Sequence, residues 1–153
     1  MIHIYSSAVE EGGVIPVRYT CDGEDVSPDI RWSGAPEEET LSYVLIMEDP
    51  DAPIGTFTHW TVYDIPASVK FLPENFPDYP QIDGIKQGIN DFGRIGYGGP
   101  CPPPGKPHRY IFRIFAIDQP SLGLPAGASR QEIEMAMTGK VIDEGSLTVY
   151  YGR

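Results

Sequence analysis

Two short stretches of the sequence hold the side chains best suited to chemistry. The first contains Asp49 and Asp51 and leads to His59, and the second contains His108 and Arg109. One carboxylate and two imidazoles can hydrogen-bond a small oxyanion such as phosphate, and a carboxylate bonded to an imidazole favours its charged form. We therefore expect Asp49, His59 and His108 to form an anion site. Asp51 and Arg109 are expected to support it by joining the two stretches through a charge-assisted bond.

The second stretch is a loop from Gly96 to Tyr110 that is rich in glycine and proline. Such a composition excludes a helix or a ladder-forming strand and predicts a loop of fixed shape. Glycines allow a ligand to approach the main chain closely, so the backbone N–H groups of Tyr97, Gly98 and Gly99 are predicted to form a concave nest for the anion. Apolar walls are expected from the remaining ring-bearing residues nearby: Pro53, Phe57, Pro100 and Pro102.

Apolar strands must position these polar groups. The run 42–48 is the clearest central strand, with five consecutive apolar residues between turn formers. Strands are also predicted at 1–8, 30–32, 61–65, 109–117 and 147–151, and 14–19 is expected to be a second short strand or an extended piece. If the strands that flank the polar groups are neighbours in one sheet, these groups converge at one edge of it.

One helix is expected, because Ser129 and Glu132 form a capping box. Its apolar face is predicted to consist of Ile133, Ala136, Met137 and Val141. Residues 68–88 contain five Pro and Gly residues and no clean period, and they predict a long irregular excursion. The sequence thus indicates a mainly β protein of one domain over residues 1–153.

The composition of the chain argues against several classes of function and partner. The formal net charge is -11, which argues against nucleic acid as a partner and against docking to an anionic membrane by charge alone. No apolar run approaches the roughly 20 residues of a transmembrane helix. With no secretory signal at the N-terminus, we expect a cytoplasmic protein. Cys21 and Cys101 are too few for a disulfide scaffold, and whether they are joined stays open.

Two other chemistries are weighed. A carboxylate with two histidines also suits a metal ion, but the close ligand spacings typical of metal sites are absent, and we expect no metal or other cofactor. Nucleophilic catalysis is weaker, because Cys101 precedes His108 by seven residues without an evident orienting group.

Several motifs together resemble the phosphatidylethanolamine-binding protein family, in its bacterial and archaeal branch of Raf-kinase-inhibitor-like members. They are Asp-Pro-Asp-Ala-Pro at 49–53, Phe-Thr-His-Trp at 57–60 and the run from Gly98 to His-Arg-Tyr at 108–110. Further matches are Tyr-Thr-Cys-Asp-Gly at 19–23, Asn-Asp-Phe at 90–92 and the ending Tyr-Gly-Arg.

The resemblance implies a large central antiparallel sheet packed on a smaller one, with one or two short helices. It also implies an anion pocket at the sheet's edge, formed by Asp49, Pro53, His59, the backbone of 97–99, His108 and Tyr110. Animal members carry Gly-Pro-Pro where this chain has Pro100-Cys101-Pro102, and they add a C-terminal helix. We therefore expect a more open pocket here, or one closed by a second subunit in a homodimer.

The function predicted from these features is non-enzymatic binding of a small anionic or phosphorylated ligand. The alternative is an inhibitor or regulator of a protease or kinase that acts through surface loops, with 68–88 as the candidate and the pocket as modulator. A hydrolase that uses the same histidines is a third reading.

Overall fold

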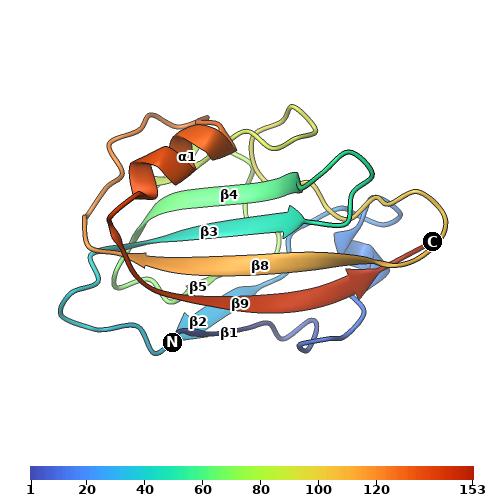
Figure 1. Ribbon diagram of the computed structural model, residues 1–153, viewed down its shortest axis with the longest axis horizontal. Helices are drawn as coiled ribbons and strands as arrows, with labels where there is room; N and C mark the ends of the chain where they lie inside the picture. The colour runs from blue at the N-terminus through green and yellow to red at the C-terminus, as the bar shows by residue number, and fades with distance from the viewer.

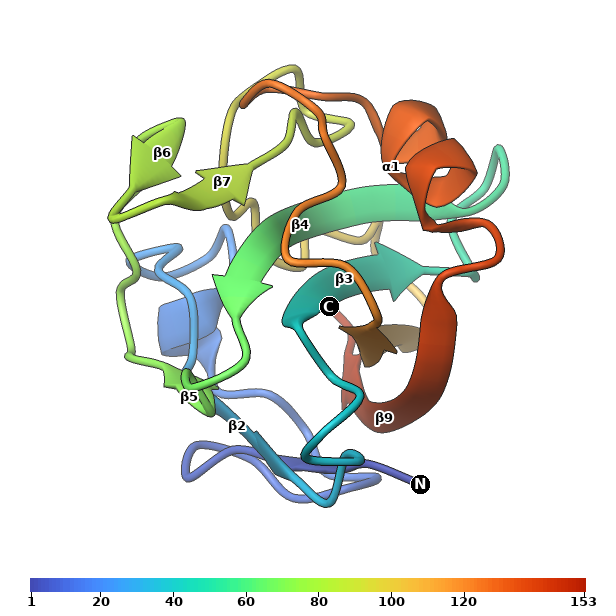
Figure 2. The same cartoon turned by 90° about the vertical axis from the view of Figure 1, so that its left-hand side faces the viewer.

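The computed structural model describes residues 1–153, which form two antiparallel sheets packed face to face (Figures 1 and 2). The larger sheet has the order β6 (Gln81–Ile82), β7 (Ile85–Gln87), β4 (Phe57–Pro66), β3 (Ser42–Asp49), β8 (His108–Ile117) and β9 (Val141–Tyr151). The smaller sheet has the order β1 (His3–Tyr5), β2 (Ile30–Ser33) and β5 (Phe71–Leu72). The predicted mainly β fold, with a large sheet on a smaller one, is confirmed.

Strand β3 lies inside the larger sheet and is buried on both faces. Tyr43, Leu45 and Met47 point into the core between the two sheets. Val44 and Ile46 point the other way, into a second core under the helix. Since successive side chains of a strand alternate between faces, a run of five apolar residues is what a doubly covered strand requires.

The helix α1 (Arg130–Met137) covers the outer face of the larger sheet (Figure 2). Its N-terminus carries the predicted capping box: Ser129 Oγ accepts from the Glu132 N–H, and Glu132 Oε1 accepts from the Ser129 N–H. Ile133 and Met137 are buried against the sheet. Val141 is not on the helical face as predicted, because the chain leaves the helix at Thr138 and Val141 begins β9.

The prediction of a second strand at 14–19 is wrong. Val14 makes one isolated parallel bridge to Tyr150, and Val17–Tyr19 forms the short 3-10 helix η1. Pro16 caps that helix with φ -61°, and it cannot donate the hydrogen bond that a continued strand would need.

Other boundaries also differ from expectation, and the strand predicted at 1–8 is limited to His3–Tyr5. Strand β4 starts at Phe57 rather than Thr61, and β9 starts at Val141 rather than Leu147, because each gains partners from an adjacent long strand. The segment 68–88 is not wholly irregular, since it contains β5, β6 and β7. These strands have two or three residues each, too short for a periodic pattern.

Candidate functional site

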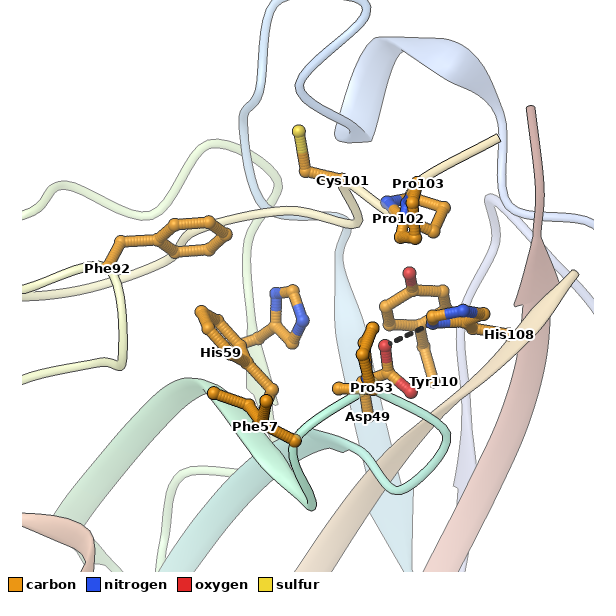
Figure 3. A pocket seen from close by; sticks show the side chains of 12 residues that line it. Asp49, Pro53, Phe57, His59, Phe92, Cys101, Pro102, Pro103, His108 and Tyr110 are labelled. Atoms are coloured by element: carbon orange, nitrogen blue, oxygen red, sulfur yellow. Dashed lines mark hydrogen bonds and ion pairs between the residues drawn. The ribbon is translucent and has the colours of Figure 1, made fainter. Parts of the chain in front are cut away.

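Three strand ends meet at one edge of the larger sheet. Asp49 closes β3 and pairs with Phe57 at the start of β4, while the preceding residue, Glu48, pairs with Ile111 of β8. Antiparallel pairing therefore places the end of β3 beside the beginnings of both neighbours. Asp49, His59 and His108 converge there, as the sequence predicts (Figure 3).

A cavity of about 320 Å³ lies at this edge. It is lined by Asp49, Ala52, Pro53, Ile54, Phe57, His59, Phe92, Cys101, Pro102, Pro103, His108 and Tyr110. Seven predicted site residues are among them: Asp49, Pro53, Phe57, His59, Pro102, His108 and Tyr110. Polar atoms are few and the walls are mainly apolar rings, which is the usual make-up of a small-molecule site.

The Asp49 carboxylate lies 2.7 Å from Nδ1 of His108 (Figure 3). Their side chains are only 5% and 12% exposed, so this bond is largely shielded from water. Because the carboxylate accepts a hydrogen bond from the Nδ1–H group, Nε2 is the nitrogen left for a ligand. This contact is the orienting one expected of Asp49.

His59 is tied to the glycine loop at both its ring and its backbone. Its Nδ1 lies 2.6 Å from the Gly98 carbonyl oxygen and therefore carries the proton, while its own carbonyl accepts from the Gly98 N–H. Nε2 faces the side of the cavity that holds Asp49 and Tyr110 (Figure 3). Burial lowers the pKa of His59, and the Gly98 carbonyl and the Asp49 charge oppose that shift. At neutral pH its Nε2 is thus an acceptor.

Tyr110 lines the cavity between the two imidazoles (Figure 3), and its hydroxyl oxygen is itself buried. The side chain is fully buried, and its oxygen makes no hydrogen bond of good geometry within the protein, although the Asp49 carboxylate is close enough to act on it. Burial, followed by the nearby Asp49 charge, raises the pKa of Tyr110, so the hydroxyl stays protonated at physiological pH. A buried polar group without a partner is costly, and a bound ligand would satisfy it.

The predicted charge-assisted bond between Asp51 and Arg109, which joins the two polar stretches, is present. Asp51 accepts from Nε of Arg109 at 3.0 Å and from Nη2 at 2.8 Å, and it also accepts from the Arg109 backbone N–H. The guanidinium lowers the pKa of Asp51 to about 2. Neither residue lines the main cavity, which agrees with the supporting role expected of them.

The predicted backbone nest is wrong. The N–H of Gly98 is bonded to the His59 carbonyl and that of Gly99 to the Asp25 carboxylate, so neither is free for a ligand. The glycines serve close packing: a Cβ at Gly98 would lie 2.4 Å from the Phe92 ring, and one at Gly99 would lie 2.2 Å from a backbone oxygen. Tyr97 packs against Trp60 in the core.

Pro100 is also not part of the cavity wall, although it was predicted to be. It is buried, and its carbonyl accepts from the Cys21 N–H. The contact holds the start of the proline-rich segment 100–107 (the proline segment) against the loop that contains Cys21, so Pro100 does not reach the cavity.

Sequence reasoning missed five wall residues: Ala52, Ile54, Phe92, Cys101 and Pro103. Phe92 is the most informative, because its ring lies 4.8 Å from that of Phe57 and 5.4 Å from that of His59. The turn that carries it is fixed by Asn90, whose Oδ1 accepts from the N–H groups of Phe92 and Arg94. An Asn-Asp-Phe turn was the available signal.

Cys21 and Cys101, left open by the sequence, form a disulfide with Cα atoms 5.4 Å apart. The bond attaches the proline segment that walls the cavity to the loop after η1. It also removes Cys101 as a free thiol, so a Cys101–His108 nucleophile pair is absent. No three His, Cys, Asp or Glu side chains are arranged to hold a metal ion. No helix has the length and apolar character needed to cross a membrane.

Comparison with known proteins decides the family. The model of the phosphatidylethanolamine-binding protein family matches residues 5–152. The chain belongs to this family. A UPF0098 protein of Aquifex aeolicus is 55% identical over 100% of this chain and 90% of its own length, and one of Methanothermobacter thermautotrophicus is 46% identical over 99% of both. Bacterial and archaeal members are thus its relatives, as the motifs indicated.

Solved structures of this family share the fold. Escherichia coli YbcL, described as a new member of the mammalian PEBP family, matches with TM-score 0.91 and 32% identity over 99% of this chain and 98% of its own. A Chlamydia trachomatis homologue, CT736, matches with TM-score 0.89 and 36% identity over 99% and 97%. The resemblance in the motifs therefore extends to the whole architecture.

Proposed function

We propose that this protein is a non-enzymatic binding protein whose cavity takes a small anionic group, such as a phosphomonoester. The observation that carries the proposal is the buried Tyr110 hydroxyl, unpartnered and placed between two oriented imidazoles. Tyr110 donates to one oxygen of the anion, and His108, supported by Asp49, donates from Nε2 when it is charged.

The donor set suits a protonated oxyanion better than a fully ionised one. No Lys or Arg lines the cavity, and the Asp49 carboxylate adds a negative charge to its wall. Neutral His59 accepts a hydrogen bond at Nε2, which a P–OH group can donate. We therefore expect preference for the monoanion of a phosphomonoester over its dianion, and an affinity that rises as pH falls.

The apolar walls set the rest of the ligand. Phe57, Phe92 and Pro103 surround the polar groups, and Ile54 at the rim is almost fully exposed. An anionic group attached to an apolar body fits this combination. Phosphatidylethanolamine, from which the family takes its name, is one molecule of that type.

Histidine ring signals in a ¹⁵N-resolved NMR titration with methyl phosphate test the proposal. The signals of His59 and His108 should move at millimolar ligand, while that of His3, which stacks on Tyr5, should stay in place. A His108→Gln variant should lose the response. If His59 and His108 show no perturbation, or move no more than His3, the proposal is wrong.

Inhibition of a protease or kinase through the surface is a second candidate. Within 68–88, the main chain is held by bonds from Asn75 and Phe76 to Ser27 and from Gln87 to the Tyr79 carbonyl. Tyr79 is 63% exposed on this anchored segment, the arrangement expected of a loop that presents a side chain to a partner. Tyr79→Ala should then abolish inhibition in a protease and kinase panel, and His108→Gln should leave it intact.

A hydrolase that uses the same histidines is the third candidate. Turnover of a phosphoester panel, lost in His108→Gln, would establish it and overturn the non-enzymatic proposal.

A further inference from the structure

A second cavity adjoins the first across His108 and Pro103, which line both. It measures about 450 Å³. Its lining is more polar: Asp51, Pro103, Pro104, Lys106, Pro107, His108, Arg109 and Tyr150. The side chains of the proline segment therefore separate an apolar cavity from a charged one, and the His108 ring belongs to both.

Lys106 gives this second cavity an uncompensated positive charge. All seven arginines form ion pairs with carboxylates, Lys86 pairs with Asp64, and Lys70 donates to the Tyr43 hydroxyl. Lys106 and Lys140 supply the two remaining side-chain cations, and neither ammonium group has an ion pair or a hydrogen bond. In a chain with a formal net charge of -11, a free ammonium beside the candidate anion site is unusual.

The other charges of this cavity are already committed. Nε and Nη2 of Arg109 both donate to the Asp51 carboxylate, so these two groups are not available to a ligand. The ion pair contributes little net charge to the cavity. His108 is bonded to Asp49 on its Nδ1 side. Lys106 is thus the group that would attract a second negative charge.

The walls around Lys106 are held in place before any ligand arrives. Pro103, Pro104 and Pro107 have fixed φ, and the N–H of Gly105, which lies between Pro104 and Pro107 in the chain, donates to the main-chain oxygen of Arg153. Arg109 pairs with Tyr150 in the β8–β9 ladder, which fixes the opposite side. A preformed wall lowers the entropic cost of binding a ligand there.

We propose that the two cavities form one composite site for a phosphomonoester that carries a second anionic group. This inference rests on the proposed function: the phosphoryl group lies between His59, His108 and Tyr110, and the second group reaches past His108 and Pro103 to Lys106. A single ammonium suits one compact negative charge, such as a carboxylate or a second phosphate.

Three ligands separate the contributions in calorimetric titrations. Methyl phosphate has only the phosphoryl group, N-acetyl-O-phosphoserine adds a carboxylate, and N-acetyl-O-phosphoserine amide is the same molecule with that charge removed. We expect the carboxylate form to bind about fivefold more tightly than the amide, the size of one exposed ion pair, and the gain should shrink in added salt. Propane-1,3-diol bisphosphate, compared with the carboxylate ligand, identifies which second anion is preferred.

Lys106→Ala should abolish the fivefold gain and leave methyl phosphate binding unchanged. Lys140→Ala is the matched control, because it removes an equally unpaired charge from the turn before β9, outside both cavities. A carboxylate gain that persists in Lys106→Ala, or no gain in the wild type, overturns this inference alone. Absence of methyl phosphate binding in all three proteins overturns the proposed function, and this inference with it.

Discussion

Asp49 Oδ2 and His108 Nδ1 lie 2.7 Å apart although 59 residues separate them in the chain. The pair is buried at the meeting point of β3 and β8, and it fixes which imidazole nitrogen faces a ligand. The carboxylate therefore has two opposite effects on a bound anion: it repels the anion directly, and it orients the imidazole that donates to the anion.

Asp49→Asn tests which effect prevails. We expect methyl phosphate to bind about tenfold more weakly, since loss of the charge-assisted bond removes more than one kcal/mol of donor support. Asp51→Asn is the control, because it changes the net charge equally at a residue outside the main cavity. Tighter binding by Asp49→Asn, measured by calorimetry, would mean that simple repulsion dominates and that the orienting role is wrong.

His59 makes stability depend on pH. Burial lowers the pKa of His59 in the folded state, whereas in the unfolded chain it titrates near 6.5. Below that pH the unfolded state binds the proton first, so the free energy of unfolding falls as pH decreases, by at most about 1.4 kcal/mol per pH unit.

Urea unfolding between pH 5 and 8 measures this contribution. The slope below pH 6.5 should be smaller in His59→Gln than in the wild type, and His3→Gln should retain the wild-type slope. An unchanged slope in His59→Gln would show that the imidazole titrates alike in both states.

Gly98 and Gly99 should respond differently to alanine. At Gly98 the added methyl meets the half-exposed Phe92 ring, which can move, so we expect a stability loss of about 1 kcal/mol and a clear change in ligand affinity. At Gly99 it meets the Tyr19 carbonyl and the Asp25 carboxylate, and the loss should reach about 3 kcal/mol. Chemical unfolding and methyl phosphate titration of both variants check this order, and the reverse order would contradict the packing role.

The Cys21–Cys101 disulfide closes a loop of 80 residues. In the chain-entropy model such a cross-link contributes about 4 kcal/mol, so the Cys21→Ala/Cys101→Ala variant should unfold at markedly lower urea concentration. Five of the eight residues from Pro100 to Pro107 are prolines, which donate no backbone hydrogen bond, so this cavity wall depends on the disulfide to stay in position. The affinity of the variant for methyl phosphate should therefore also fall. An unchanged affinity in the variant would show that the segment 100–107 keeps its position without the disulfide.

The features that could be predicted from the sequence are those that follow from local patterns of residue types. Strand β3 followed from its uninterrupted apolar run, and the convergence of Asp49, His59 and His108 followed from their places at strand ends. The capping box at Ser129 located the helix because it is a local signal with a defined geometry.

The rest depends on contacts between distant segments. The N–H groups of Gly98 and Gly99 are used by His59 and Asp25, which no local pattern reveals, so the nest was predicted where close packing occurs. Phe92 reaches the cavity because Gly98 has no side chain. Cytoplasmic location, a homodimer and the absence of a nucleic-acid partner stay predictions. For location the disulfide is relevant, since such bonds are rare in most cytosolic proteins.

A crystal grown with phosphate at mildly acidic pH, where the monoanion prevails, tests the anion cavity most directly. We predict density for the anion in the cavity, with one oxygen within hydrogen-bond distance of the Tyr110 hydroxyl and others near Nε2 of His59 and of His108. A cavity without the anion at saturating concentration, or an anion bound only elsewhere on the surface, would contradict the assignment of this site.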